Sequence, residues 1–169
     1  MKKLILVLAG LLLSALTFAQ NDSTQPAYKR FPTFPPIKLL LPDSSSIYTK
    51  NDLPKKTPVI LMIFNPGCEH CRHETEEILK NMESFKDIHI VMATNMPFDT
   101  MMSFRRTFQL EKYKNIVVGQ DTHYFLPGFY MMHNLPFLAF YNRKKELISV
   151  FEGSLPIPSI LEIFKDKTD

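Results

Sequence analysis

The sequence has 169 residues, with 20 Lys and Arg side chains against 17 Asp and Glu, and only two cysteines. Its formal charge of +3 falls to +1 without the first 19 residues, because Lys2 and Lys3 are the only charged side chains among them. A nearly neutral chain without a basic stripe does not fit a nucleic-acid-binding protein. No internal repeat is visible, which excludes a repeat array.

The N-terminal stretch carries the features of an export signal. Met1-Lys2-Lys3 is basic, an apolar run follows from Leu4 to Leu16, and Thr17-Phe18-Ala19 offers small residues for cleavage. This pattern predicts a signal peptide over residues 1–19, cleaved near Ala19, and a periplasmic mature protein. The apolar run is short for a membrane span, so membrane attachment is expected only if the signal peptide is retained.

The rest of the chain divides by composition. Residues 20–36 are polar and contain four prolines, which predicts a flexible leader. Residues 37–165 are long enough for a single domain with one core, and residues 166–169 form a polar tail.

Within that domain, short apolar runs predict strands and apolar residues at helical spacing predict helices. Strands are expected at residues 37–41, 47–49, 59–64, 88–94, 116–118, 137–141 and 146–151. The first two and the last two strands are expected to form hairpins. Helices are expected after the cysteines, after Asp99 as an N-cap, briefly within residues 123–134, and at residues 158–165. The order predicts an α/β fold with a central mixed β-sheet flanked by helices.

Both cysteines lie where a buried strand gives way to a helix. The strand at Val59–Phe64 ends at the turn Asn65-Pro66-Gly67, and Cys68 and Cys71 follow in C-x-x-C spacing. At a helix N-terminus, free N–H groups and the helix dipole favour a thiolate over a thiol. We therefore expect Cys68 at the N-cap or first helical position with an exposed sulfur, and Cys71 one turn further and more buried. So short a disulfide loop would add little stability, which favours a redox-active pair over a structural one.

Three titratable residues lie close to the cysteines in sequence. His70 stands between them, where its imidazole would stabilise the Cys68 thiolate, whereas Glu69 would oppose this. Glu74 is three residues after Cys71 on the expected helix, so a partly buried carboxyl there would accept the Cys71 proton. The alternatives are that Glu69 and His70 are simply solvated and that Glu74 only stabilises the helix dipole.

From about Ile37 to Lys165 the chain resembles the TlpA/ResA-like thiol-disulfide oxidoreductases of the thioredoxin superfamily. The resemblance rests on the leading hairpin, the strand–C-x-x-C–helix corner, the αβ insertion after the first βαβ unit, and Leu135-Pro136 opening a strand. It implies a thioredoxin-like fold with an N-terminal hairpin and a central αβ insertion.

The resemblance also implies roles for individual residues. Pro136 matches a cis-proline that lies beside the dithiol and, with Leu135, helps to dock an extended substrate. Glu74 matches the acidic residue of a C-x-x-C-x-x-E pattern. Two positions depart from the pattern: Gly67 replaces the usual Trp, and Met62 replaces the buried Asp of thioredoxin itself.

The expected function is an exported oxidoreductase that exchanges a Cys68–Cys71 dithiol or disulfide with protein substrates, acting as a reductase. Its expected partners are protein thiols or disulfides and an upstream electron donor in the cell envelope. We expect a monomer with no cofactor and no metal. Because His70 and Glu69 act in opposite directions, the sequence does not fix the direction of electron flow.

Two other functions use the same fold. A copper metallochaperone would bind copper through the cysteines and a histidine, with methionines as further soft ligands. The residues available for this are Cys68, Cys71, His70, His73, His133, Met101, Met102, Met131 and Met132. Sco-type copper chaperones space their cysteines differently. A peroxiredoxin-like peroxidase would need Thr or Ser where this chain has Asn65.

Overall fold

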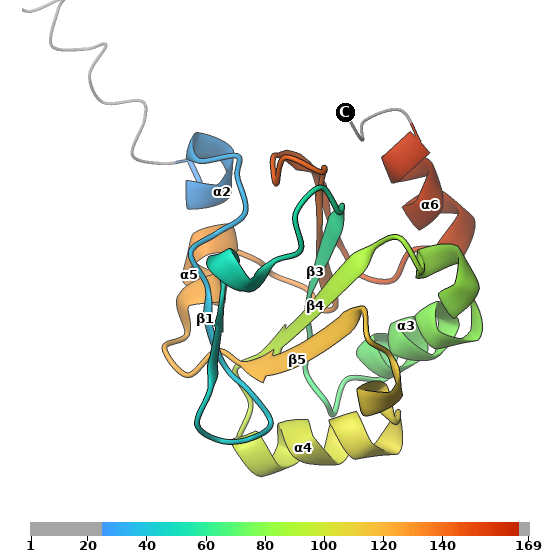
Figure 1. Ribbon diagram of the computed structural model, residues 1–169. Coiled ribbons are helices and arrows are strands. Elements are labelled where there is room, and N and C mark those ends of the chain that lie inside the picture. Colours follow the sequence, from blue (N-terminus) through green and yellow to red (C-terminus); the bar gives the residue numbers. More distant parts are fainter. Residues whose placement is uncertain (1–24, 166–169) are drawn as a thin grey trace, which may run out of the picture.

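The computed structural model describes residues 25–165 (Figure 1). The expected signal peptide (1–19), the first part of the leader (20–24) and the tail (166–169) lie outside these residues. The helices are α2 (Ala27–Arg30), α3 (Glu69–Lys80), α4 (Phe98–Thr107), α5 (Phe125–Tyr130) and α6 (Ile157–Lys165), with 3-10 turns η2 (Lys50–Asp52), η3 (Met82–Phe85) and η4 (Leu110–Lys112). The strands are β1 (Lys38–Leu40), β2 (Ile47–Thr49), β3 (Val59–Ile63), β4 (His89–Thr94), β5 (Ile116–Gln120), β6 (Phe137–Tyr141) and β7 (Leu147–Glu152).

Within the described residues, the strands form one seven-stranded sheet in the order β2-β1-β5-β4-β3-β6-β7. Strands β3, β4 and β5 run parallel, and the remaining neighbours pair antiparallel. The β1–β2 hairpin precedes the β3–α3–β4 unit, and α4 and β5 follow it. The expected mixed sheet with flanking helices is therefore confirmed, together with its leading hairpin and inserted αβ unit.

The sheet carries a hydrophobic layer on each face. The central strand β3 is therefore buried over its whole length. Ile60 and Met62 belong to the layer that contains residues of α3, α4 and α6. Leu61 and its odd-numbered neighbours belong to the layer that contains residues of α5 and Phe34. Figure 1 shows the same division, with α3, α4 and α6 on one side of the sheet and α2 and α5 on the other. A central strand buried on both faces gives the residues that follow it a fixed position.

The expectation of a flexible leader up to residue 36 is wrong for its second half. Residues 27–30 form α2, and Thr33 forms a β-bridge with Glu146 beside β7. Phe34 is only 1% exposed and contacts the ring of Tyr141 edge-on, at 4.9 Å between ring centroids. Proline content alone did not reveal that an aromatic side chain here would complete the core.

One helix start also differs from the expectation. Helix α4 begins at Phe98, and Pro97 occupies the N-cap position without a side-chain cap. Asp99 therefore lies inside the first turn, where its charge still complements the helix dipole. The fixed φ of Pro97 suits the entry to a helix, which explains the earlier start.

No helix within residues 25–165 is both long and apolar enough to cross a membrane.

Candidate active site

Cys68 occupies the N-cap position of α3, in agreement with the expectation from sequence. The chain leaves β3 through a turn in which the Cys68 amide donates to the Asn65 carbonyl oxygen at 3.0 Å. The side-chain oxygen of Asn65 accepts from the Gly67 amide at 2.8 Å, which closes the turn. The cysteine is thereby fixed at the point where the free N–H groups of the helix begin.

The two cysteines have different surroundings. Both are free thiols; Cys68 is half-buried, whereas Cys71 is fully buried in the layer beneath α3. The Cys71 amide donates to Sγ of Cys68 at 3.4 Å, so the cysteine sulfur itself caps the helix. Burial raises the pKa of the Cys71 thiol to about 12. An accessible sulfur therefore lies at the helix end, with a protonated, shielded one behind it.

The loop before β6 also lies beside Cys68. The Leu135–Pro136 peptide bond is cis, as the resemblance implies. Sγ of Cys68 lies 3.9 Å from the Leu135 carbonyl oxygen, as the donor of a long S–H···O bond. Leu135 is half-buried and Pro136 is buried. The structure thus brings this dipeptide and the C-x-x-C segment together, although they are far apart in sequence.

Glu74 lies on the buried side of α3 and is only 1% exposed. Its Oε2 accepts from the Leu155 amide at 3.0 Å, whereas its Oε1 has no hydrogen-bond partner among the described residues. Burial raises the pKa of this carboxyl, against the lowering effect of the Leu155 bond. A pocket of about 340 Å³, lined also by His73 and Ser154, adjoins it. Glu74 is therefore a stronger proton acceptor than an exposed glutamate.

The other residues singled out from sequence are less closely tied to the dithiol. The His70 imidazole is exposed and forms no hydrogen bond with either sulfur within residues 25–165, although its carbonyl accepts from Ser154 Oγ at 3.2 Å. Glu69 is exposed as well.

The soft metal ligands considered above are scattered. Met101 is fully buried in the core, whereas Met131 is 54% exposed after α5. Among residues 25–165, no group of three or more His, Cys, Asp or Glu side chains is placed to hold a metal ion. The His133 side chain faces a carboxylate, with 3.7 Å between its Nδ1 and Oε1 of Glu152.

Sequence reasoning missed one part of the site, the turn that follows β7. Residues 152–155 contact the Leu135–Pro136 loop, the C-x-x-C segment and Glu74. Most of these contacts use backbone amides or a backbone carbonyl, which carry no signal in a sequence. Only Gly153, which adopts φ +103°, marks a turn that requires glycine.

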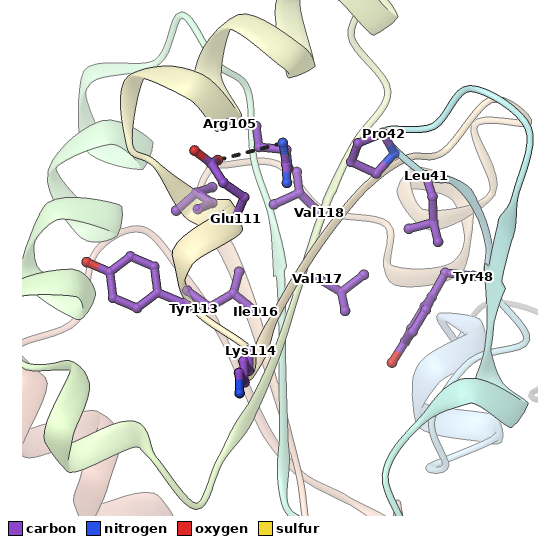
Figure 2. A pocket seen from close by; sticks show the side chains of 11 residues that line it. Leu41, Pro42, Tyr48, Arg105, Glu111, Tyr113, Lys114, Ile116, Val117 and Val118 are labelled. Carbon is purple, nitrogen blue, oxygen red and sulfur yellow. Dashed lines mark ion pairs between the residues drawn. The ribbon is translucent and has the colours of Figure 1, made fainter.

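A separate hollow of about 320 Å³ lies between the β1–β2 hairpin, β5 and the end of α4 (Figure 2). Its charged side chains are Lys114 and the ion pair of Arg105 with Glu111 at 3.6 Å. The Tyr48 hydroxyl is bonded to His89 at 2.8 Å, and burial raises the pKa of this tyrosine to about 12. None of the residues that line it belongs to the dithiol site.

No family model matches the chain, and no curated protein matches its sequence. Solved structures do match. A secreted disulfide oxidoreductase of Mycobacterium tuberculosis, described as homologous to E. coli DsbE, superimposes with a TM-score of 0.62 at 14% identity, over 76% of this chain and 93% of that chain. The fold is thioredoxin-like.

Two further structures share this thioredoxin-like fold. StoA from Bacillus subtilis has 15% identity and a TM-score of 0.57, over 76% of this chain and 97% of that chain. The exposed lipoprotein thioredoxin Etrx1 of Streptococcus pneumoniae has 23% identity and a TM-score of 0.56, over 75% and 95%. At these identities the comparisons establish the fold alone.

Proposed function

We propose that this protein is an extracytoplasmic thiol-disulfide oxidoreductase of the TlpA/ResA-like type, which reduces protein disulfides with the Cys68–Cys71 dithiol. One observation carries the proposal: an accessible sulfur caps helix α3, while a second thiol, fully buried, lies one turn behind it. This asymmetry suits a pair in which one sulfur attacks and the other resolves.

In the first step, the Cys68 thiolate attacks one sulfur of a substrate disulfide. The Cys68 Sγ–S bond forms as the substrate S–S bond breaks, and the leaving thiolate takes up a proton from water. The helix N-terminus stabilises the attacking thiolate. The Leu135 carbonyl, 3.9 Å from Sγ, belongs to the backbone along which we propose that the substrate lies.

In the second step, Cys71 attacks Sγ of Cys68 and releases the second substrate thiolate, which leaves a Cys68–Cys71 disulfide. The Cys71 thiol must first lose its proton, and burial holds its pKa at about 12. We assign the proton to Glu74, whose buried carboxyl adjoins the same part of α3 and has a raised pKa. Two electrons pass to the substrate, and an upstream dithiol must return them.

Three considerations support an extracytoplasmic location and a protein substrate. The basic and apolar pattern of residues 1–19 is that of a signal peptide. The M. tuberculosis protein with the same fold is itself described as secreted and as a disulfide oxidoreductase. The chain has no cysteine besides Cys68 and Cys71, so an oxidising environment can form no other disulfide within it.

The proposal is tested by following insulin reduction with dithiothreitol as the electron donor. The wild-type protein should accelerate the reaction, and a Cys68→Ser/Cys71→Ser double variant should not. Equilibration with dithiothreitol at varied ratios would then give the reduction potential of the pair, which decides the direction of electron flow when it is compared with the potential of a donor or substrate. If the wild type does not exchange disulfides but its reduced form binds Cu(I), the copper-chaperone function replaces this one.

A further inference from the structure

The turn after β7 joins the two halves of the proposed site. The Gly153 amide donates to the Pro136 carbonyl oxygen at 2.8 Å, on the substrate-loop side. On the side of α3, Ser154 Oγ donates to the His70 carbonyl oxygen at 3.2 Å and the Leu155 amide donates to Glu74 at 3.0 Å. One short stretch of chain thus sets the distance between the loop and the helix.

Glu152, the last residue of β7, contributes the largest number of bonds on the loop side. Its Oε2 accepts from the His133 amide at 3.1 Å, from the Asn134 amide at 2.8 Å, and from the Asn134 side-chain nitrogen at 3.2 Å. Although burial acts to raise it, these hydrogen bonds hold the pKa of Glu152 below its usual value. The carboxylate is therefore charged at neutral pH, and charge-assisted bonds to backbone N–H groups are strong.

The loop that Glu152 holds is the one that meets the reactive sulfur. Leu135 follows Asn134 directly, and its carbonyl oxygen is the atom 3.9 Å from Sγ of Cys68. On the far side of Leu135, the carbonyl of Pro136 is held by Gly153. The backbone of Leu135 is thus fixed from both ends by adjacent residues of one turn.

We propose that Glu152 is a positioning residue for polypeptide substrates, because it holds the Leu135 backbone where an extended chain flanking a disulfide would bind beside Cys68. The inference rests on the function proposed above. It assigns Glu152 to docking and not to the chemistry of the sulfurs, because its carboxylate bonds to the loop and not to either cysteine. A small disulfide, which needs no backbone contact, should not depend on Glu152.

The test compares insulin, a polypeptide disulfide, with cystamine, a small one, for the wild type and for Glu152→Ala and Glu152→Gln. For Glu152→Ala we expect the KM for insulin to rise about fivefold or more, with kcat and the rate with cystamine changed less than about twofold. Glu152→Gln keeps an acceptor oxygen at the same distance from the backbone, so its KM for insulin should lie closer to the wild-type value than that of Glu152→Ala.

Glu146→Ala is the matched control. Glu146 lies at the other end of the β6–β7 hairpin and also accepts from an asparagine side chain, that of Asn142, at 2.8 Å. A similar loss of thermal stability in both alanine variants, with the KM change only in Glu152→Ala, supports the inference. The inference would be overturned if Glu146→Ala and Glu152→Ala had the same KM for insulin, or if Glu152→Ala lost as much activity with cystamine as with insulin. A wild-type protein that reduces neither disulfide contradicts the proposed function itself.

Discussion

The amide of Cys71 donates a hydrogen bond to the sulfur of Cys68 at 3.4 Å. A sulfur is therefore the N-cap of α3, in the place where Ser, Thr, Asp or Asn usually stands. The bond is stronger to a thiolate than to a thiol, because the sulfur then carries a full negative charge. The same contact that begins the helix thus involves the sulfur that we propose attacks the substrate.

Replacement of Glu74 by Gln should slow the second step of exchange by about tenfold or more, since general-base assistance is lost. In the wild type the rate of this step should rise with pH as Glu74 ionises, and the variant should lack that rise. Quenched-flow measurement of the mixed disulfide checks both. Glu76→Gln, an exposed position on the same helix, is the control. Equal rates and pH profiles in all three proteins would reduce Glu74 to a structural role.

Glu74→Gln should also change the dependence of stability on pH. Since burial raises the pKa of Glu74 in the folded protein above its ordinary value of 4.5, the folded state binds this proton more tightly than the unfolded state. The contribution of protonated Glu74 to stability is complete below pH 4.5 and is lost as the pH rises through the pKa of Glu74 in the folded protein. The variant should therefore gain stability over the wild type on going from acid to neutral pH, as measured by urea unfolding. A constant difference would contradict the raised pKa.

His89 should make the protein sensitive to acid. It is 8% exposed, its Nε2 bonds to the Tyr48 hydroxyl, and burial lowers its pKa from 6.5 to about 4. The folded state binds a proton at His89 less tightly than the unfolded state does. The contribution of neutral His89 to stability is therefore complete above pH 6.5 and is lost as pH falls toward 4. The loss should approach roughly 3 kcal/mol.

Urea unfolding of His89→Gln across this range checks the effect. The variant should show a flatter acid limb than the wild type, because the neutral amide has no proton to gain. His123→Gln, at an exposed site, should follow the wild type. A wild-type slope retained in His89→Gln would show that other groups cause the acid sensitivity.

Gly119 allows β1 to approach β5 closely. A Cβ at this position would lie 2.7 Å from the Cβ of Leu39 and 3.2 Å from the Leu40 carbonyl oxygen. Gly119→Ala should therefore lower the free energy of unfolding by about 1–3 kcal/mol. Gly128→Ala is the control, since nothing lies within 4 Å of its added Cβ in α5 and alanine favours a helix by about 0.5–1 kcal/mol. Equal stability of the two variants would contradict the close packing.

The part of the site that lies on α3 was predictable from sequence because its signals are local. A buried strand, a turn of Asn65-Pro66-Gly67 and two cysteines at a change of period place Cys68 at the N-cap. Helical spacing predicted the burial of Cys71 and made Glu74 its neighbour, whereas the full burial of Glu74 is a finding of the structure. The cis bond at Pro136 and its place beside Cys68 came from the resemblance, since periodicity alone says nothing of either.

What the sequence did not reveal is held by long-range contacts. Glu152 looks like an ordinary charged residue at a strand end, and its partners are backbone amides about 20 residues earlier. The Leu155 amide that bonds to Glu74 has no side-chain signature. Phe34, in a proline-rich stretch, is buried against Tyr141 in the core layer that also contains residues of α5. Such positions are fixed by tertiary packing and not by local preference.

The most direct test of the proposed function asks which sulfur captures a substrate. Reduced Cys71→Ser and Cys68→Ser proteins are mixed with a fluorescent peptide that contains a disulfide, and adducts are separated on a non-reducing gel. Because Cys68 is the accessible sulfur at the helix N-terminus, Cys71→Ser should accumulate a peptide adduct that dithiothreitol releases, and Cys68→Ser should form none. Capture by Cys68→Ser alone, or by neither protein, would contradict the account.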